Sequence, residues 1–435
     1  MRVSTAQESP LALPSRWVRG SAVPYAASLL ASVMIGAWVN YLGDRVNPGE
    51  WLFKGQSMGI VIPIVAFPIV VLLWWLCQSY VRRDPWVSAV LLGLIVAWPV
   101  HFWIAKAHGD QLPHTAWIYM PALLLLVIKP PTPVEAFQIV QWFAALASIL
   151  IVVTWALEQT NIIPVFGVPE YVTTFDRERY WIPIGELLGI DGRWPGPFGG
   201  NSRTGFVGVT IVLIAVHGLR RRHVAWSLLL LVVGMLTVLA CASRGAFLAL
   251  AVGLLICAAF TRRGWIGQIS RKLRIAIAGV LLAGGAIAML MSPAASAGRV
   301  DSIWPAFIDL WRSSPWIGVG QVGILADPQA GISMEAHNLV LQEVTRFGIV
   351  GVIVQFVPLV LGVALCIAAA FGGLAWPLAL VASFATASFF DAFIDGCLSI
   401  STYILLVVLA FFGASPSRGE RTNSSAKTGR DAIYG

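Results

Sequence analysis

The chain has 435 residues, of which 58% are hydrophobic and only 11% are charged, and its formal net charge is +8. Soluble domains carry about a quarter of charged residues, so this composition excludes an ordinary soluble protein and indicates a membrane protein. Apolar segments in a bilayer must be helical, because each backbone polar group there needs an internal partner. No segment alternates in the two-residue pattern of a membrane β-barrel, so we expect an all-α polytopic fold.

The apolar runs predict about twelve transmembrane helices. A span needs about 20 residues, and a few of these runs are shorter than that. In chain order the runs lie near 22–40, 57–79, 85–103, 114–128, 134–157, 204–218, 224–241, 245–260, 275–293, 348–371, 374–390 and 397–413. The first run has no clear cleavage site after it, so we expect a retained span rather than a signal peptide.

The basic residues predict the orientation of the spans. If the N-terminus is cytoplasmic, 18 of the 29 Lys and Arg residues fall on the cytoplasmic side. They are concentrated in short loops, as in Arg220 to Arg222 and in the segment 262–274, where this bias is most informative. We therefore expect both termini to face the cytoplasm.

Two long segments between spans are expected to face the other side. They are rich in Gly, Pro, Trp and charge, and ordered loops of such length are usually functional. The chain is accordingly divided into an N-terminal segment 1–21, helices 1 to 5 at 22–157, a first loop 158–203, helices 6 to 9 at 204–293, a large loop 294–347 with short amphipathic helices, helices 10 to 12 at 348–413 and a disordered tail 414–435.

The spans contain almost no ionisable groups away from their ends. Ion-coupled transporters normally need such groups in the membrane interior, so this pattern disfavours a secondary transporter. A lipid flippase with a weakly charged cavity remains an alternative. His101 and His217 lie near span ends rather than at the midplane.

Three arginines lie just outside spans on the non-cytoplasmic side. Arg203 stands in "GGNSRTGF", Arg244 in "ACASRGAF" and Arg299 in "SAGRVDSIW". Each could be a headgroup anchor, which is the common role of an arginine at a helix end. Alternatively, a helix start and a guanidinium together favour a phosphate group, so the three could converge on a phosphate-bearing lipid.

The stretch "SMEAHNLVLQEVTRFG" predicts a polar helix directly before a span. Asn338, Gln342, Thr345 and Arg346 share one face of it by their spacing. His337 lies near the first turn, where a histidine is most often structural. At a membrane surface beside arginines, a neutral imidazole could instead accept a proton from a sugar hydroxyl.

Metal and nucleotide sites are not expected. Asp391 and Asp395 are four residues apart in "FFDAFIDG", but no third ligand is near in sequence, and capping of a short loop explains them. "GVGQVG" follows no strand and is therefore not a dinucleotide motif.

Several of these motifs together resemble the O-antigen ligase and polymerase superfamily. The similarity is carried by "GRVDSIWPAFIDLWRSSPWIGVG", by "AHNLVLQEVTRFGIVG" and by "SRGAF". It extends from about Asn201 to Gly351, whereas the first five spans match in hydropathy alone.

The resemblance implies an inverting glycosyltransferase of the bacterial inner membrane whose active site faces the periplasm. It would move O-antigen from undecaprenyl diphosphate to lipid A-core without a metal or cofactor, and its partners would be these two lipids and the membrane, not nucleic acid. O-antigen polymerase and protein O-oligosaccharyltransferase are alternatives within the superfamily. His337 would be catalytic, with Arg203, Arg244 and Arg299 binding the diphosphate, and further sugar or phosphate contacts are expected from Asn201, Asn338, Gln342, Arg346 and Asp391.

Overall fold

The computed structural model describes part of the chain. The described residues are 85–109, 131–160, 194, 196–198, 201–220, 224–260, 270–280, 303–328, 330, 336, 338–390 and 398–415. Outside them lie the expected N-terminal segment, the expected spans 22–40, 57–79 and 114–128, much of both long loops and nearly all of the tail.

The described residues form helices and no strand, which confirms the all-α expectation for this part of the chain. Four helices (α5, α8, α9 and α17) are long and apolar enough to cross a membrane, which indicates a membrane protein. The total of twelve spans stays a prediction. The helices are α3 (Pro85–Ala107), α5 (Pro133–Gln159), α8 (Asn201–Arg220), α9 (Val224–Cys241), α10 (Arg244–Phe260), α14 (Trp304–Ser313), α15 (Gly320–Ala326), α17 (Leu339–Phe371), α18 (Trp376–Phe390) and α19 (Leu398–Ala414).

The start of α5 illustrates how local sequence fixes a helix. Pro133 occupies the first turn, where its missing N–H costs nothing. Thr132 is the N-cap: the backbone N–H of Glu135 donates to its Oγ1 at 3.3 Å, and the backbone N–H of Thr132 donates to Glu135 Oε2 at 2.8 Å. This reciprocal capping box begins the 27-residue apolar helix.

Helices α8 and α9 form a closely packed hairpin. Gly208 and Gly234 face each other at the crossing, and a Cβ on either glycine would lie 3.0 Å from the carbonyl oxygen of the other. Small residues allow this backbone approach, which is the usual way for helices to pack where lipid removes the hydrophobic driving force.

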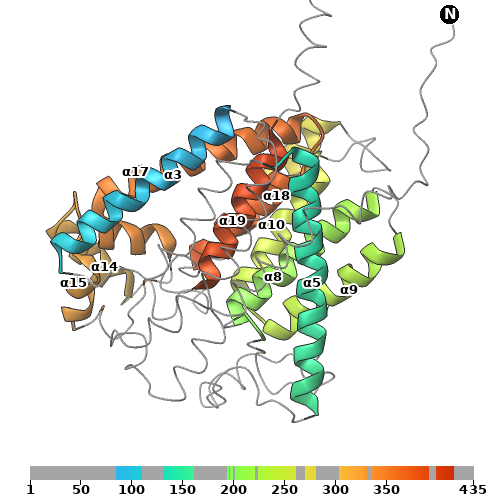
Figure 1. Ribbon diagram of the computed structural model, residues 1–435, viewed down its shortest axis with the longest axis horizontal. Coiled ribbons are helices and arrows are strands. Elements are labelled where there is room, and N and C mark those ends of the chain that lie inside the picture. The colour runs from blue at the N-terminus through green and yellow to red at the C-terminus, as the bar shows by residue number, and fades with distance from the viewer. Residues whose placement is uncertain are drawn as a thin grey trace, which may run out of the picture.

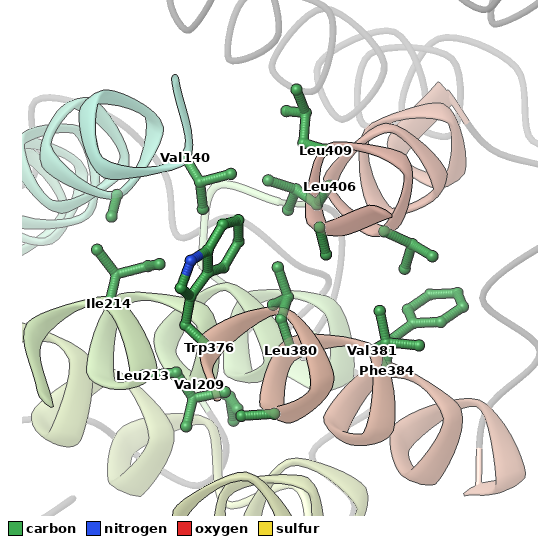
Figure 2. Packing of buried hydrophobic residues seen from close by; sticks show 14 of the residues in the cluster. Val140, Val209, Leu213, Ile214, Trp376, Leu380, Val381, Phe384, Leu406 and Leu409 are labelled. Atoms are coloured by element: carbon green, nitrogen blue, oxygen red, sulfur yellow. The ribbon is translucent and has the colours of Figure 1, made fainter. Parts of the chain in front are cut away.

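Trp376, the first residue of α18, lies at the centre of the main core. It is 1% exposed. Figure 2 shows its ring near Ile214 of α8 and Val140 of α5. The core therefore joins α5, α8, α18 and α19, and Figure 1 shows these helices gathered in one bundle.

Helix ends that the sequence assigns to the cytoplasmic side contact one another at one end of this bundle. His217 of α8 contacts Phe137 of α5 edge to face, with ring centroids 4.8 Å apart. Phe260 at the end of α10 contacts Phe371 at the end of α17 at 5.2 Å. Arg271 Nη1 donates to the carbonyl of Phe371 at 3.1 Å. These contacts pair α5 with α8 and bring the ends of α10 and α17 together with Arg271, which is compatible with the predicted topology. The orientation of the protein in the membrane stays a prediction.

Helix α3 runs alongside α17 (Figure 1). Pro358 interrupts the hydrogen-bonding pattern inside α17, and a Cβ on Gly93 of α3 would overlap the ring of that proline. The two helices are therefore in close contact where α17 is locally weakened.

The outward faces of the long helices are apolar. Leu229 and Val232 of α9 are each 54% exposed, and Ile353 and Val360 of α17 are 55% and 63% exposed. Such continuous apolar faces are expected where lipid chains, not water, surround a helix.

Candidate functional site

The starts of α8 and α10 lie side by side. Ser243 directly precedes α10, and its Oγ donates to the Oγ of Ser202, the second residue of α8, across 3.4 Å. A Cβ on Gly205 would lie 2.9 Å from the Cβ of Ala246, so the two helices touch with no room for another side chain. Two helix N-termini, each with backbone N–H groups that lack helical partners, therefore meet in one place.

A very short turn between α9 and α10 fixes the second of these starts. Ala242 adopts a left-handed conformation with φ 46°, which is unusual for a residue with a side chain. Ser243 then caps α10, because its Oγ accepts from the backbone N–H of Ala246 at 3.4 Å and its carbonyl accepts from Phe247 at 3.0 Å.

Two of the three predicted diphosphate-binding arginines belong to these helix starts. Arg203 is the third residue of α8 and is half-buried, and Arg244 is the first residue of α10. The backbone of Arg244 is described, whereas its side chain is not. Asn201 begins α8, and its Oδ1 accepts from the backbone N–H of Ser202 at 2.9 Å. The partial positive charge of two helix N-termini favours an anion here, and one arginine belongs to each of these helix starts.

A buried pair, Trp194 and Glu158, stabilises the start of α8, and the sequence analysis did not single it out. Trp194 Nε1 donates to Glu158 Oε2 at 2.7 Å, and the backbone N–H of Trp194 donates to the carbonyl of Ala240 at 3.0 Å. Gly196, with φ 58°, packs directly against the side chain of Thr204. The ends of α5 and α9 are thereby tied to the start of α8. The available sequence signal was the Gly- and Pro-rich stretch "GRWPGPFGG".

A second place of interest surrounds the start of α17. Ala336 is held twice: its N–H donates to Gln342 Oε1 at 2.7 Å, and its carbonyl accepts from Trp304 Nε1 at 2.9 Å. Asn338 is the N-cap of α17. His337 itself lies outside the described residues. Both of its neighbours are buried and hydrogen-bonded, so the chain is fixed immediately before and after position 337.

The polar face predicted for this helix is largely turned inward. Gln342 and Thr345 are both fully buried, and Thr345 Oγ1 donates to the carbonyl of Phe307 in α14 at 3.0 Å. These two side chains hold α14 and the preceding loop to α17, and contact of Gln342 with a sugar stays a prediction. Glu343, 2% exposed, is a buried acid that the sequence analysis did not single out.

Gly348 divides α17 into a short first segment and a long second one. Its backbone has φ 65° and ψ −171°, a conformation that only glycine adopts readily. At this break the N–H groups of Ile349 and Val350 donate to the carbonyls of Pro315 and Trp316 at 2.9 and 3.1 Å. The loop after α14 therefore supplies the hydrogen bonds that the broken helix lacks.

The first glycine of "GVGQVG", Gly318, serves this same connection. Gly318 has φ 70°, and a Cβ there would overlap the α17 backbone. The next residue, Val319, donates its N–H to the carbonyl of Thr345 at 2.9 Å. His108, just after α3, makes a hydrogen bond through Nε2 to the carbonyl of Ile317 at 3.2 Å. Gly318 thus has a packing function in the structure.

His101 of α3 also holds the break in α17. Its Nε2 makes a hydrogen bond of 3.1 Å to the carbonyl of Gly351, which requires the ring to carry its proton on that nitrogen. The ring stacks on Phe347 with centroids 4.2 Å apart and planes 1° from parallel. The guanidinium of Arg346 lies 5.6 Å from the centroid of the same Phe347 ring. His101, which the sequence analysis set aside, thus positions Phe347 beside Arg346, a predicted contact residue.

Both places lie at the same end of the helix bundle. The second segment of α17 and α18 are joined by a short turn and pack against each other, so the break in α17 and the end of α18 lie at one end. At that end Phe384 of α18 contacts Phe206 of α8, with centroids 5.8 Å apart. In Figure 1, α14 and α15 lie on the left beside the start of α17. Arg299 and Asp391 lie outside the described residues.

Within the described part of the chain, no three His, Cys, Asp or Glu side chains are grouped so that they could hold a metal ion. No protein-family model matches the chain, and no curated protein is significantly similar to it. A function must therefore be inferred from the residues and their arrangement.

Proposed function

We propose that this protein is a membrane glycosyltransferase of the O-antigen ligase type. It transfers a glycan from undecaprenyl diphosphate to the lipid A-core oligosaccharide at the periplasmic face of the bacterial inner membrane. The observation that carries this proposal is the pairing of two arginine-bearing helix starts, α8 and α10, at the same bundle end as the anchored segment around position 337.

The leaving group is the first requirement of the reaction. The bond between the anomeric carbon and the diphosphate oxygen breaks, and the diphosphate keeps the electron pair. Arg203, Arg244 and the N–H groups at the two helix starts would stabilise this negative charge in a site of low dielectric constant. Arg299 would add to them. This arrangement needs no divalent metal for charge stabilisation.

The acceptor is the second requirement. A hydroxyl of the core sugar attacks the anomeric carbon from the face opposite the diphosphate, which inverts the configuration there. The imidazole of His337 would accept the hydroxyl proton as general base. The buried contacts of Ala336 and Asn338 support this role, because a general base must be held within hydrogen-bond reach of its proton.

The membrane supplies proximity. Both substrates are lipids, so the apolar outer faces of α9 and α17 can hold them in the same leaflet as the site. The basic short loops support a cytoplasmic position for the opposite bundle end. Asn201, Asn338, Arg346 and Asp391 are the proposed further contacts to sugar or phosphate.

Transfer with purified components tests the proposal. The protein in lipid nanodiscs is incubated with glycan-linked undecaprenyl diphosphate and lipid A-core, and the glycosylated product is separated by electrophoresis. We expect product with the native protein and a loss of at least 100-fold with His337→Ala, the scale of a general base. Val340→Ala, at an exposed position of the same helix, is the matched control and should retain activity.

The acceptor distinguishes the alternatives. Product on carrier-linked glycan alone would replace the ligase by a polymerase, and product on protein would indicate a protein O-oligosaccharyltransferase. Movement of the carrier lipid across the bilayer without any transfer would indicate a flippase and overturn the enzymatic proposal. Unchanged turnover in His337→Ala would remove the catalytic role of that residue.

A further inference from the structure

Ser388, near the end of α18, carries a buried hydroxyl that has no hydrogen-bond partner among the described residues. The residue is 3% exposed, and within the described part of the chain its Oγ makes no hydrogen bond. A helical serine commonly donates to the carbonyl four residues earlier, as Ser148 does to Ala144 at 2.8 Å. A buried hydroxyl left unpaired destabilises a protein, so its presence calls for a reason.

The course of α18 along α8 shows which way Ser388 faces. Trp376 at the start of α18 lies next to Ile214 in Figure 2. Two turns further along α18, Phe384 contacts Phe206, which lies two turns nearer the start of α8. The two helices are therefore antiparallel, and the same face of α18 follows α8 toward its N-terminus.

One more turn brings Ser388 to the start of α8. Ser388 is four residues after Phe384 and Ser202 is four residues before Phe206, so both lie on the facing sides of their helices. Because the helices are antiparallel, these two steps lead to the same level. Ser202 is the residue whose Oγ is joined to Ser243 at the start of α10.

A contact between α18 and α10 gives the same level. Ser383 Oγ donates to the carbonyl of Ala249 at 2.7 Å, which fixes the register between α18 and α10. Helix α18 is antiparallel to α8, and α8 and α10 begin side by side, so α18 and α10 also run in opposite directions. Five residues after Ser383 is Ser388, and five residues before Ala249 is Arg244, the first residue of α10.

We propose that the Ser388 hydroxyl is part of the anion site at the starts of α8 and α10, where it donates a hydrogen bond to the diphosphate of the donor lipid. This inference rests on the proposed function and extends it to α18. The anion would then meet three hydroxyl-bearing elements: Ser202 on α8, Ser243 before α10 and Ser388 on α18. A neutral hydroxyl bound to a phosphate oxygen makes a charge-assisted hydrogen bond, which is stronger than one between neutral groups.

Binding of undecaprenyl diphosphate to the full chain in nanodiscs tests this inference, with undecaprenol, which lacks the phosphates, as the reference ligand. We expect Ser388→Ala to raise the Kd for undecaprenyl diphosphate by about tenfold, the usual scale for a hydrogen bond to a charged group. Binding of undecaprenol should not change. The ligand-free variant should unfold at the same temperature as the native protein or higher, because an unused buried hydroxyl has been removed. An unchanged Kd would overturn the inference.

Ser383→Ala is the matched control on the same helix. Its hydroxyl is used by the fold, so this variant should be less stable without ligand yet bind undecaprenyl diphosphate normally. An equal loss of affinity in both variants would assign the effect to helix packing and overturn the role of Ser388.

Arg203→Ala separates this inference from the proposed function. If Arg203→Ala weakens diphosphate binding and Ser388→Ala does not, the donor site stands and Ser388 is excluded from it. If the native protein binds undecaprenyl diphosphate no more tightly than undecaprenol, the donor site and the role of Ser388 both fail.

Discussion

Replacing Gly348 by alanine tests how the break in α17 is maintained. Its φ of 65° and ψ of −171° lie where a residue with a side chain is strained, at a cost of about 1–3 kcal/mol. The added Cβ would also overlap the backbone of Trp316, so the loop after α14 would have to move away from α17. The strain adds to the loss of the hydrogen bonds between this loop and the break, so we expect a total loss of roughly 3 kcal/mol or more in the free energy of unfolding.

Two other glycines separate strain from collision. Gly109 has φ 74° but nothing within 4 Å of a Cβ, so Gly109→Ala should cost about 1 kcal/mol from strain alone. Gly279 is helical and equally open, so Gly279→Ala should stabilise the protein by about 0.5–1 kcal/mol. Equilibrium unfolding in mixed micelles, followed by tryptophan fluorescence, measures all three. If Gly348→Ala loses no more stability than Gly109→Ala, the packing of the loop against the break has been misread.

Four further outcomes are expected. Trp194→Phe should destabilise the protein by about 1–3 kcal/mol, because it leaves the buried Glu158 carboxyl without its 2.7 Å donor; an unfolding curve identical to that of the native protein would contradict this. His101→Phe keeps a ring to stack on Phe347 but removes the hydrogen bond to Gly351, so the free energy of unfolding should fall by about 1 kcal/mol in the same assay. A variant as stable as the native protein would contradict this contact. The double variant Arg203→Lys with Arg244→Lys should lower kcat/KM for the lipid-linked donor at least tenfold while the protein stays folded, since lysine cannot make the bidentate contact; unchanged kinetics would reject the guanidinium clamp. Glycan transfer should be unaffected by a chelator, and activity that is lost in chelator and restored by a divalent ion would refute metal independence.

Hydropathy alone was enough to find the described apolar helices. The runs 134–157, 204–218 and 224–241 each correspond to a helix with similar ends, because every backbone group in a membrane segment must be satisfied within its own helix. The sequence also places the start of a span at residue 348, and α17 breaks at Gly348, since a glycine flanked by two helical patterns permits a change of direction there.

The pairing of distant segments could not be predicted in this way. Nothing in the local sequence states that Gly205 packs on Ala246, yet this contact brings the starts of α8 and α10 together. The helix face containing Gln342 and Thr345 illustrates the same limit. Its polar spacing was visible, but whether it faced substrate or protein depended on the position of α14, which only tertiary packing decides.

Helix α17 is interrupted at two points, Gly348 and Pro358, which lie within three turns of each other. The neighbouring α3 spans both interruptions: His101 makes a hydrogen bond beside Gly348, and Gly93 packs against Pro358. A mutational scan should therefore find sensitive positions along one stripe of α3, although that helix supplies none of the proposed catalytic groups. Loss of these α3 contacts would displace the segment that carries position 337.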